Sequence, residues 1–200
     1  MTAATDPSAD LPTDPSTDPS ADLPTDPSTD PSADPSTDPS ADPSADPSAA
    51  RWTVEAPTGA DFAAWRELFR GYCAFYRVPI PDEKARLVWS WLTDPAHELE
   101  GLLVRDTDGT PVGLAHYRPF VRPLHGAVAG FLDDLYVAPA ARGTGAVDLL
   151  LARLRGIAAE RGWTAIRWIT SEDNYRARGK YDQVATRTGF VTYDMPPAGR

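Results

Sequence analysis

Apolar side chains recur with the period of a helix in two neighbouring stretches of the chain. Over residues 60–78 they are spaced by three and four positions, and Pro79 then interrupts the pattern. This spacing predicts an amphipathic helix that ends before the proline. Residues 82–94 predict a second helix, because two acidic residues follow Pro81, where the helix dipole favours them.

Strand patterns, in which apolar and polar positions alternate, appear before and after these helices. A short strand is predicted before Gly59, and a later pair of strands forms a hairpin with its bend at Asp108-Gly109. Strands and helices then alternate toward the C-terminus. In chain order, the expected strands lie at 51–58, 98–106, 111–120, 126–139, 164–171 and 190–195, and the later helices end near 162 and span 172–188.

This order of elements predicts an α+β fold. A hairpin-rich first half is followed by a strand–helix–strand unit, which needs one parallel crossover. The expected sheet is therefore mixed and mostly antiparallel, with helices on both faces and one βαβ crossover.

Residues 1–50 differ in composition from the rest of the chain. They consist almost wholly of Asp, Pro, Ser, Thr and Ala, and Asp stands at every fourth position from Asp6 to Asp46. Prolines in nearly every repeat exclude a helix, and too few apolar side chains are present to offset the entropy of ordering. We therefore expect a disordered acidic tail over 1–50 and one folded domain over 51–200.

The tail also accounts for the negative charge of the chain. It holds eleven of the 29 acidic residues and no basic ones, so the remaining 150 residues carry 18 acidic and 19 basic groups. A net charge of +1 without clustered Lys or Arg does not indicate a nucleic-acid-binding surface. Cys73 is the only cysteine, no signal peptide is recognisable, and no apolar run reaches the roughly 20 residues of a membrane span. These features favour a cytoplasmic protein without a membrane segment.

The stretch "YVAPAARGTGAVDLLLARL" places a turn with few side chains, called the bare turn below, between a strand and a helix. The first N–H groups of such a helix have no intrahelical partner, and they carry the positive end of the dipole. Gly143 and Gly145 would let a ligand approach this backbone, and Arg142 adds forked donors, so the turn suits a pyrophosphate. Alternatively, the glycines only relieve a tight turn. The motif is neither a Walker A loop nor a dinucleotide fingerprint.

Three elements in order resemble the GNAT superfamily of acyl-CoA-dependent N-acetyltransferases. They are the acidic strand "LDDLYVAP", the loop "RGTGA", and the pattern formed by Asn174, Ala177 and Tyr181 with a following Gly-Phe. The resemblance covers about 52–195 and implies a GNAT-type sheet. Within the superfamily, "GLAHYR" and "FLDDLYV" look most like the branch that acetylates small amines, including polyamine and D-amino-acid acetyltransferases.

The resemblance implies a site for acetyl-CoA and a set of residues that bind it. The pantetheine arm would lie between two splayed parallel strands, and the pyrophosphate would lie on the bare turn. Val147 and Asp148 depart from the family pattern, since one limits the approach of a phosphate and the other could repel it. The spacing from Tyr181 to the Gly-Phe pair is also longer than usual. The implied cofactor-binding residues are Leu135, Tyr136, Val137, Arg142, Gly143, Thr144, Gly145, Ala146, Asn174, Ala177 and Tyr181.

Acetyl transfer to an amine needs a base for the amine proton and an acid for the departing thiolate. By the resemblance, Asp133 aligns with an acidic residue that takes the proton through water, and Tyr181 with a proton donor to the sulfur. Asp134 could equally bind the ammonium group of the substrate, or either aspartate could pair with an arginine. Strand alternation would put Asp133 and Asp134 on opposite faces. Core packing is the alternative for Tyr181, and capping of the last helix is an alternative or additional role for Asn174.

Other candidates are supported less directly. His116 could line the acceptor pocket or be a satisfied structural histidine, facing opposite to Tyr117. Tyr76, Asp82 and Glu83 lie near or in the loop between the first two helices, where this fold shapes acceptor specificity. No Cys or His cluster has the spacing of metal ligands, so we expect no metal cofactor.

The expected function is transfer of an acetyl group from acetyl-CoA to the primary amine of a small molecule or amino acid, by direct attack. The alternatives are a GNAT-fold module that binds acyl-CoA or a partner without catalysis, and an enzyme that acetylates protein lysines or N-termini. Dimers are common in the superfamily, so a homodimer is also possible.

Overall fold

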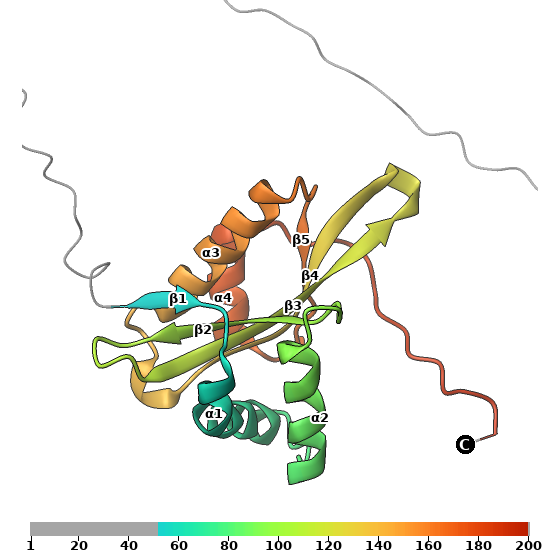
Figure 1. Cartoon of the computed structure of the whole chain (residues 1–200). Coiled ribbons are helices and arrows are strands. Elements are labelled where there is room, and N and C mark those ends of the chain that lie inside the picture. Colours follow the sequence, from blue (N-terminus) through green and yellow to red (C-terminus); the bar gives the residue numbers. More distant parts are fainter. Residues whose placement is uncertain (1–51, 200) are drawn as a thin grey trace, which may run out of the picture. The chain divides into compact units, whose positions relative to one another are not determined.

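The computed structural model describes residues 52–199, and the predicted acidic tail lies outside these residues (Figure 1). Five strands form one sheet in the order β1-β2-β3-β4-β5. Neighbours pair antiparallel except for β4 and β5, which are parallel. The strands are β1 (Thr53–Glu55), β2 (Glu100–Arg105), β3 (Pro111–Arg122), β4 (Ala127–Val137) and β5 (Ile166–Arg167).

Helices cover both faces of this sheet, as Figure 1 shows. On one face, α1 (Phe62–Phe75) and α2 (Asp82–Thr93) pack through a cluster centred on the fully buried Trp65. On the other face, α3 (Ala146–Glu160) packs through its leucines against β2, β3 and β4. The last helix is α4 (Tyr175–Val184), and short 3-10 turns lie at Gly59–Asp61, Pro123–His125 and Pro139–Ala141.

The predicted fold class is confirmed. The sheet is mixed and mostly antiparallel, and α3 connects β4 to the parallel strand β5, which gives the expected βαβ crossover. Apolar residues at helical spacing in α1 and α3 face the sheet, so the periodicity of the sequence identified the buried faces.

The C-terminal part of the chain differs from the prediction. The predicted strand at 164–171 is reduced to the two residues of β5, and the helix predicted over 172–188 is confined to α4. The predicted strand at 190–195 is wrong, because no strand of the described residues pairs with this segment, and its apolar side chains are exposed. Alternation identifies a segment that could become a strand, but a strand also needs an edge in register with it.

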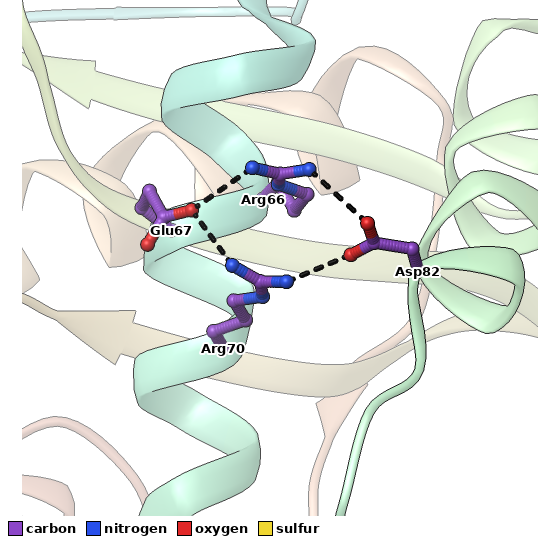
Figure 2. A network of polar contacts seen from close by, with 4 residues as sticks. All are labelled: Arg66, Glu67, Arg70 and Asp82. Carbon is purple, nitrogen blue, oxygen red and sulfur yellow. Dashed lines mark hydrogen bonds and ion pairs between the residues drawn. The ribbon is translucent and has the colours of Figure 1, made fainter.

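A network of ion pairs joins the first two helices (Figure 2). Arg70 of α1 lies 2.7 Å from the carboxylate of Asp82, the first residue of α2, and Arg66 lies 3.6 Å from the same carboxylate. Glu67 lies 3.2 Å from Arg70. These groups are largely exposed, so each pair adds little stability, at most about 1 kcal/mol. Their geometric effect is to hold the start of α2 beside α1. Asp82, a sequence candidate for acceptor recognition, is thus engaged in this network.

Between residues 52 and 199, none of the helices is long and apolar enough to cross a membrane.

Candidate active site

A cleft of about 430 Å³ lies where β4 ends, beside the turn into α3 and the helix α4. It contains ten of the eleven residues that the resemblance implies for the cofactor; the exception is Thr144. Tyr76 also lines it, whereas Asp133, Asp134 and His116 do not. The cleft residues are Tyr72, Phe75, Tyr76, Leu135, Tyr136, Val137, Ala141, Arg142, Gly143, Gly145, Ala146, Val147, Asp148, Asn174, Arg176, Ala177, Lys180 and Tyr181.

The cleft opens because β4 and β5 separate. Their parallel pairing ends at Phe131 and Arg167, whereas β4 continues to Val137. The last part of β4 therefore pairs with β3 on one side only. Its other side borders the cleft, where backbone groups are available to an extended ligand.

The turn into α3 is shaped by two glycines in the left-handed region. Gly143 has φ 83° and Gly145 has φ 90°, a conformation that residues with a side chain rarely adopt. A Cβ atom at either position would meet no other atom, so the space above the turn is open. Gly145 is the N-cap of α3, and the first N–H groups of that helix have no intrahelical acceptor. The turn therefore presents backbone donors and a positive dipole end to the cleft.

Arg142 and Thr144 brace this turn. The Nε atom of Arg142 donates to the carbonyl oxygen of Val137 at 3.2 Å, and the guanidinium lies over the Tyr136 ring. The hydroxyl of Thr144 donates to the carbonyl oxygen of Ala141 at 2.7 Å. Thr144 thus stabilises the turn from within, and Arg142 lies at the wall of the cleft.

Asp148, the residue expected to repel a phosphate, has a partner. Its carboxylate forms an ion pair with the ammonium group of Lys180 in α4, and both residues line the cleft. The pair joins the first turn of α3 to α4 and offsets the negative charge beside the turn.

α4 supplies the opposite wall of the cleft. Asn174 is the N-cap residue of α4, but its side chain forms no cap and instead donates to the Thr170 hydroxyl at 3.3 Å. The Tyr181 ring packs edge-on against Trp168, and its burial raises the pKa of the phenol. A phenol with a raised pKa keeps its proton at neutral pH, as a proton donor must.

A β-bulge corrects the predicted orientation of the two aspartates. His116 pairs with Asp134, but the next residue, Tyr117, pairs with Leu132, so Asp133 is the extra residue of β4. Asp134 lies 2.8 Å from His116, and Asp133 lies 3.2 Å from Arg118. His116 and Arg118 are two residues apart in β3 and share one face of the sheet. Both aspartates therefore turn to the α1 face, because the bulge interrupts the alternation.

The two carboxylates have pKa values shifted in opposite directions. Burial alone would raise the pKa of Asp134, but hydrogen bonds from His116 and Tyr72 hold it below its ordinary value. Burial raises the pKa of Asp133 above its ordinary value, although Arg118 opposes this and the Asp134 charge adds to it. Two neighbouring carboxyls with diverging pKa values are a common arrangement at catalytic sites.

Tyr72 was not a sequence candidate, yet it connects Asp134 to the cleft. It lines the cleft and hydrogen bonds to Asp134, and burial together with that carboxylate raises the pKa of its phenol. α1 can approach β4 closely because Gly71 has no side chain; a Cβ there would lie 2.4 Å from the Tyr136 hydroxyl oxygen. In the sequence, Tyr72 is one of several aromatic residues at core spacing, so nothing set it apart.

His116 lies behind Asp134 and not on the cleft surface. Its side chain is 1% exposed and faces α1, opposite to Tyr117, as predicted. Tyr76 lies at the C-terminal end of α1, where it is partly exposed and borders the cleft. Cys73 is buried, and burial raises the pKa of its thiol, which disfavours the reactive thiolate form.

Comparisons with known proteins show the family of the chain. The model of the acetyltransferase (GNAT) family matches residues 65–185. The D-amino-acid N-acetyltransferase HPA3 of Saccharomyces cerevisiae is 33% identical over 144 residues, which cover 72% of this chain and 89% of that protein. The uncharacterized N-acetyltransferase YhfO of Bacillus subtilis is 28% identical over 136 residues, covering 67% and 90%.

Solved structures show the same fold. A probable acetyltransferase superposes with a TM-score of 0.65 at 24% identity, covering 74% of this chain and 99% of that one. The aminoglycoside N-acetyltransferase AAC(6')-Iy in complex with CoA superposes with a TM-score of 0.62 at 17% identity, covering 72% and 94%. The family model, which matches more than half of the chain, defines an acetyltransferase. The chain belongs to the GNAT acetyltransferase family, and it is an N-acetyltransferase.

Proposed function

We propose that this enzyme transfers an acetyl group from acetyl-CoA to the primary amine of a small molecule or amino acid. The observation that carries the proposal is the cleft, which has a turn with unpartnered backbone N–H groups at one end and, on its wall, Tyr72, whose phenol hydrogen bonds to the Asp134 carboxylate behind it. The relative HPA3 is named for acetylating D-amino acids, which supports a small amine as acceptor.

The residues of the cleft fit acetyl-CoA. The free N–H groups at the start of α3 and the open space above Gly143 and Gly145 suit a pyrophosphate. The backbone of Leu135, Tyr136 and Val137 would hold the pantetheine arm, with Asn174 on the other side. Acetyl-CoA supplies the activated thioester that the amine attacks.

The two aspartates would bind and deprotonate the acceptor amine. Asp134, whose pKa is lowered, is a carboxylate at neutral pH and would hold the ammonium group beside Tyr72. Asp133 would take the amine proton through a water molecule, since it faces the same side of the sheet without lining the cleft. The raised pKa of Asp133 brings it nearer to neutral pH, where a general base works best.

Tyr181 would complete the proton balance. Its phenol keeps its proton, lines the cleft and would give that proton to the thiolate sulfur as the thioester bond breaks. The acetyl group then forms an amide bond with the acceptor nitrogen, and CoA leaves as the free thiol. Of the two protons that the ammonium group loses, one goes to Asp133 through water and the other restores the Tyr181 phenol.

The test is CoA release in the presence of acetyl-CoA and separate sets of D-amino acids, L-amino acids, polyamines and lysine-containing peptides. We expect turnover with a small amine, and a kcat lowered about 100-fold or more in Tyr181→Phe. Tyr193→Phe, an exposed tyrosine outside the cleft, is the matched control and should retain full activity. Turnover with peptides alone, or an unchanged kcat in Tyr181→Phe, would contradict the proposal.

A further inference from the structure

Asp134 lies at the end of a buried chain of hydrogen bonds that begins at Trp65. The indole Nε1 of Trp65 donates to Nε2 of His116 at 2.9 Å. Nδ1 of His116 lies 2.8 Å from a carboxylate oxygen of Asp134. Trp65 is fully buried and His116 is 1% exposed, so water does not compete for these bonds.

The chemistry of the indole decides the tautomer of the histidine. The indole nitrogen of tryptophan can only donate, so Nε2 of His116 must accept and carries no proton. The ring proton therefore resides on Nδ1, where it is donated to Asp134. If the indole were absent, Nε2 could bind a proton or carry the proton of the other tautomer, and the donor to Asp134 would no longer be fixed.

The ring of His116 is also fixed in orientation. It packs beside the rings of Trp65 and Phe69, which stack on each other, with centroids 5.9 Å and 5.4 Å away. Both aromatic residues project from α1, one helical turn apart, whereas His116 and Asp134 face each other across β3 and β4. Packing of α1 on the sheet thus aligns the Trp65 indole, the His116 imidazole and the Asp134 carboxylate.

We propose that Trp65 and His116 are positioning residues for acetyl transfer: they hold Asp134 as an oriented carboxylate that receives the ammonium group of the acceptor. This role rests on the proposed function. Tyr72 contacts the same carboxylate from the cleft side, so an incoming amine meets a carboxylate whose buried side is already satisfied. A carboxylate oriented in advance needs no reorganisation when the amine binds.

The first test determines which ring nitrogen of His116 carries the proton, and it needs no acceptor amine. The chain has three histidines, so His97→Gln and His125→Gln in the full chain leave only His116 for nitrogen NMR. Near neutral pH we expect a protonated Nδ1 and a bare Nε2 in this protein, and loss of that fixed pattern when Trp65→Phe is added. A proton on Nε2 before Trp65 is changed would overturn the inference.

The second test measures how loss of the Trp65 donor changes the KM for the amine acceptor. Trp65→Phe keeps an aromatic ring but removes the donor, so we expect the KM for the amine to rise about tenfold while the KM for acetyl-CoA is unchanged. Trp91→Phe, a partly exposed tryptophan of α2 stacked on His97, is the matched control and should change neither. Equal changes in both KM values would indicate a merely structural role and contradict the proposal.

The third test asks whether the residues act through Asp134. His116→Gln can both accept and donate, so it should retain more amine affinity than His116→Leu. In an Asp134→Asn background, Trp65→Phe should add little further loss, because the group that it positions is already changed. Additive losses would overturn the inference. If no amine is acetylated at all, the proposed function fails, but the NMR result still decides the tautomer.

Discussion

Two regions, one behind the wall of the cleft around Asp134 and one in its lining at the turn into α3, present hydrogen-bonding groups in different ways. On the α1 side, Asp134 is held by donors from the side chains of His116 and Tyr72, and its buried partners are satisfied within the protein. At the turn into α3, the donors are backbone N–H groups, which lack partners in the helix. The first region is built from side chains of α1, β3 and β4 that pack together. The second region is a turn in which two glycines leave the backbone accessible.

The two regions should therefore respond differently to amino-acid substitutions. Substitutions near Asp134 remove one of several cooperating side chains, so their effects should be large and should depend on one another. Substitutions in the turn alter access and conformation of the backbone, so their effects should depend mainly on the bulk and allowed φ of the new residue.

The largest effect is expected at the proposed base. Asp133→Asn should lower kcat about 100-fold at saturating amine. Because burial raises the pKa of Asp133, kcat of the unmodified enzyme should fall as the pH falls through this raised value, where the carboxylate becomes protonated. The acid limb of the kcat profile should disappear in the variant. Asp108→Asn, in the exposed turn between β2 and β3, should keep both kcat and the acid limb. An Asp133→Asn enzyme with the original profile would place the base elsewhere.

An intermediate effect is expected at the turn. Gly145→Ala should weaken acetyl-CoA binding about tenfold and destabilise the fold by about 1 kcal/mol, because its φ of 90° is unfavourable for alanine. The measurement is the melting temperature with and without acetyl-CoA, since ligand at about 100 times its Kd stabilises by about 2.7 kcal/mol.

The matched control for the turn lies in the same helix. Gly156 is inside α3, where a Cβ would make only ordinary contacts, the nearest at 3.6 Å. Gly156→Ala should therefore raise stability by about 1 kcal/mol and leave the acetyl-CoA shift unchanged. If both variants bound acetyl-CoA equally well, the turn would not be the phosphate site.

The smallest effect is expected at the ion pair between α3 and α4. Lys180→Ala should weaken acetyl-CoA binding by up to about fivefold, because it exposes the Asp148 carboxylate beside the turn. Adding Asp148→Asn should restore the affinity, and the effect should shrink at high ionic strength. Affinity that stays low in the double variant would mean that Lys180 acts on the cofactor itself. The affinity of each variant for acetyl-CoA is measured by titration.

The sequence by itself determined the fold class and the position of the glycine turn before α3. Helical periodicity identified the buried faces of α1 and α3, because those patterns are local and repeat over several turns. Gly143 and Gly145 marked the turn because a left-handed backbone almost requires glycine, so the residue type carries the conformation. The acidic tail, a cytoplasmic location and a homodimer stay predictions.

Only the tertiary structure decided how the groups around Asp134 are assembled beside the cleft. The bulge at Asp133 depends on the register between β3 and β4, which no local pattern specifies. Trp65 and Tyr72 looked like core residues in the sequence, and His116 could have been either an acceptor-pocket residue or a structural histidine; all three pack in or against the core. His116 meets Asp134 through the pairing of β3 with β4, and the close packing of α1 against β4 at Gly71 brings Trp65 to His116 and Tyr72 to Asp134. The segment at 190–195 shows the same limit, since its alternation is local whereas a pairing edge is not.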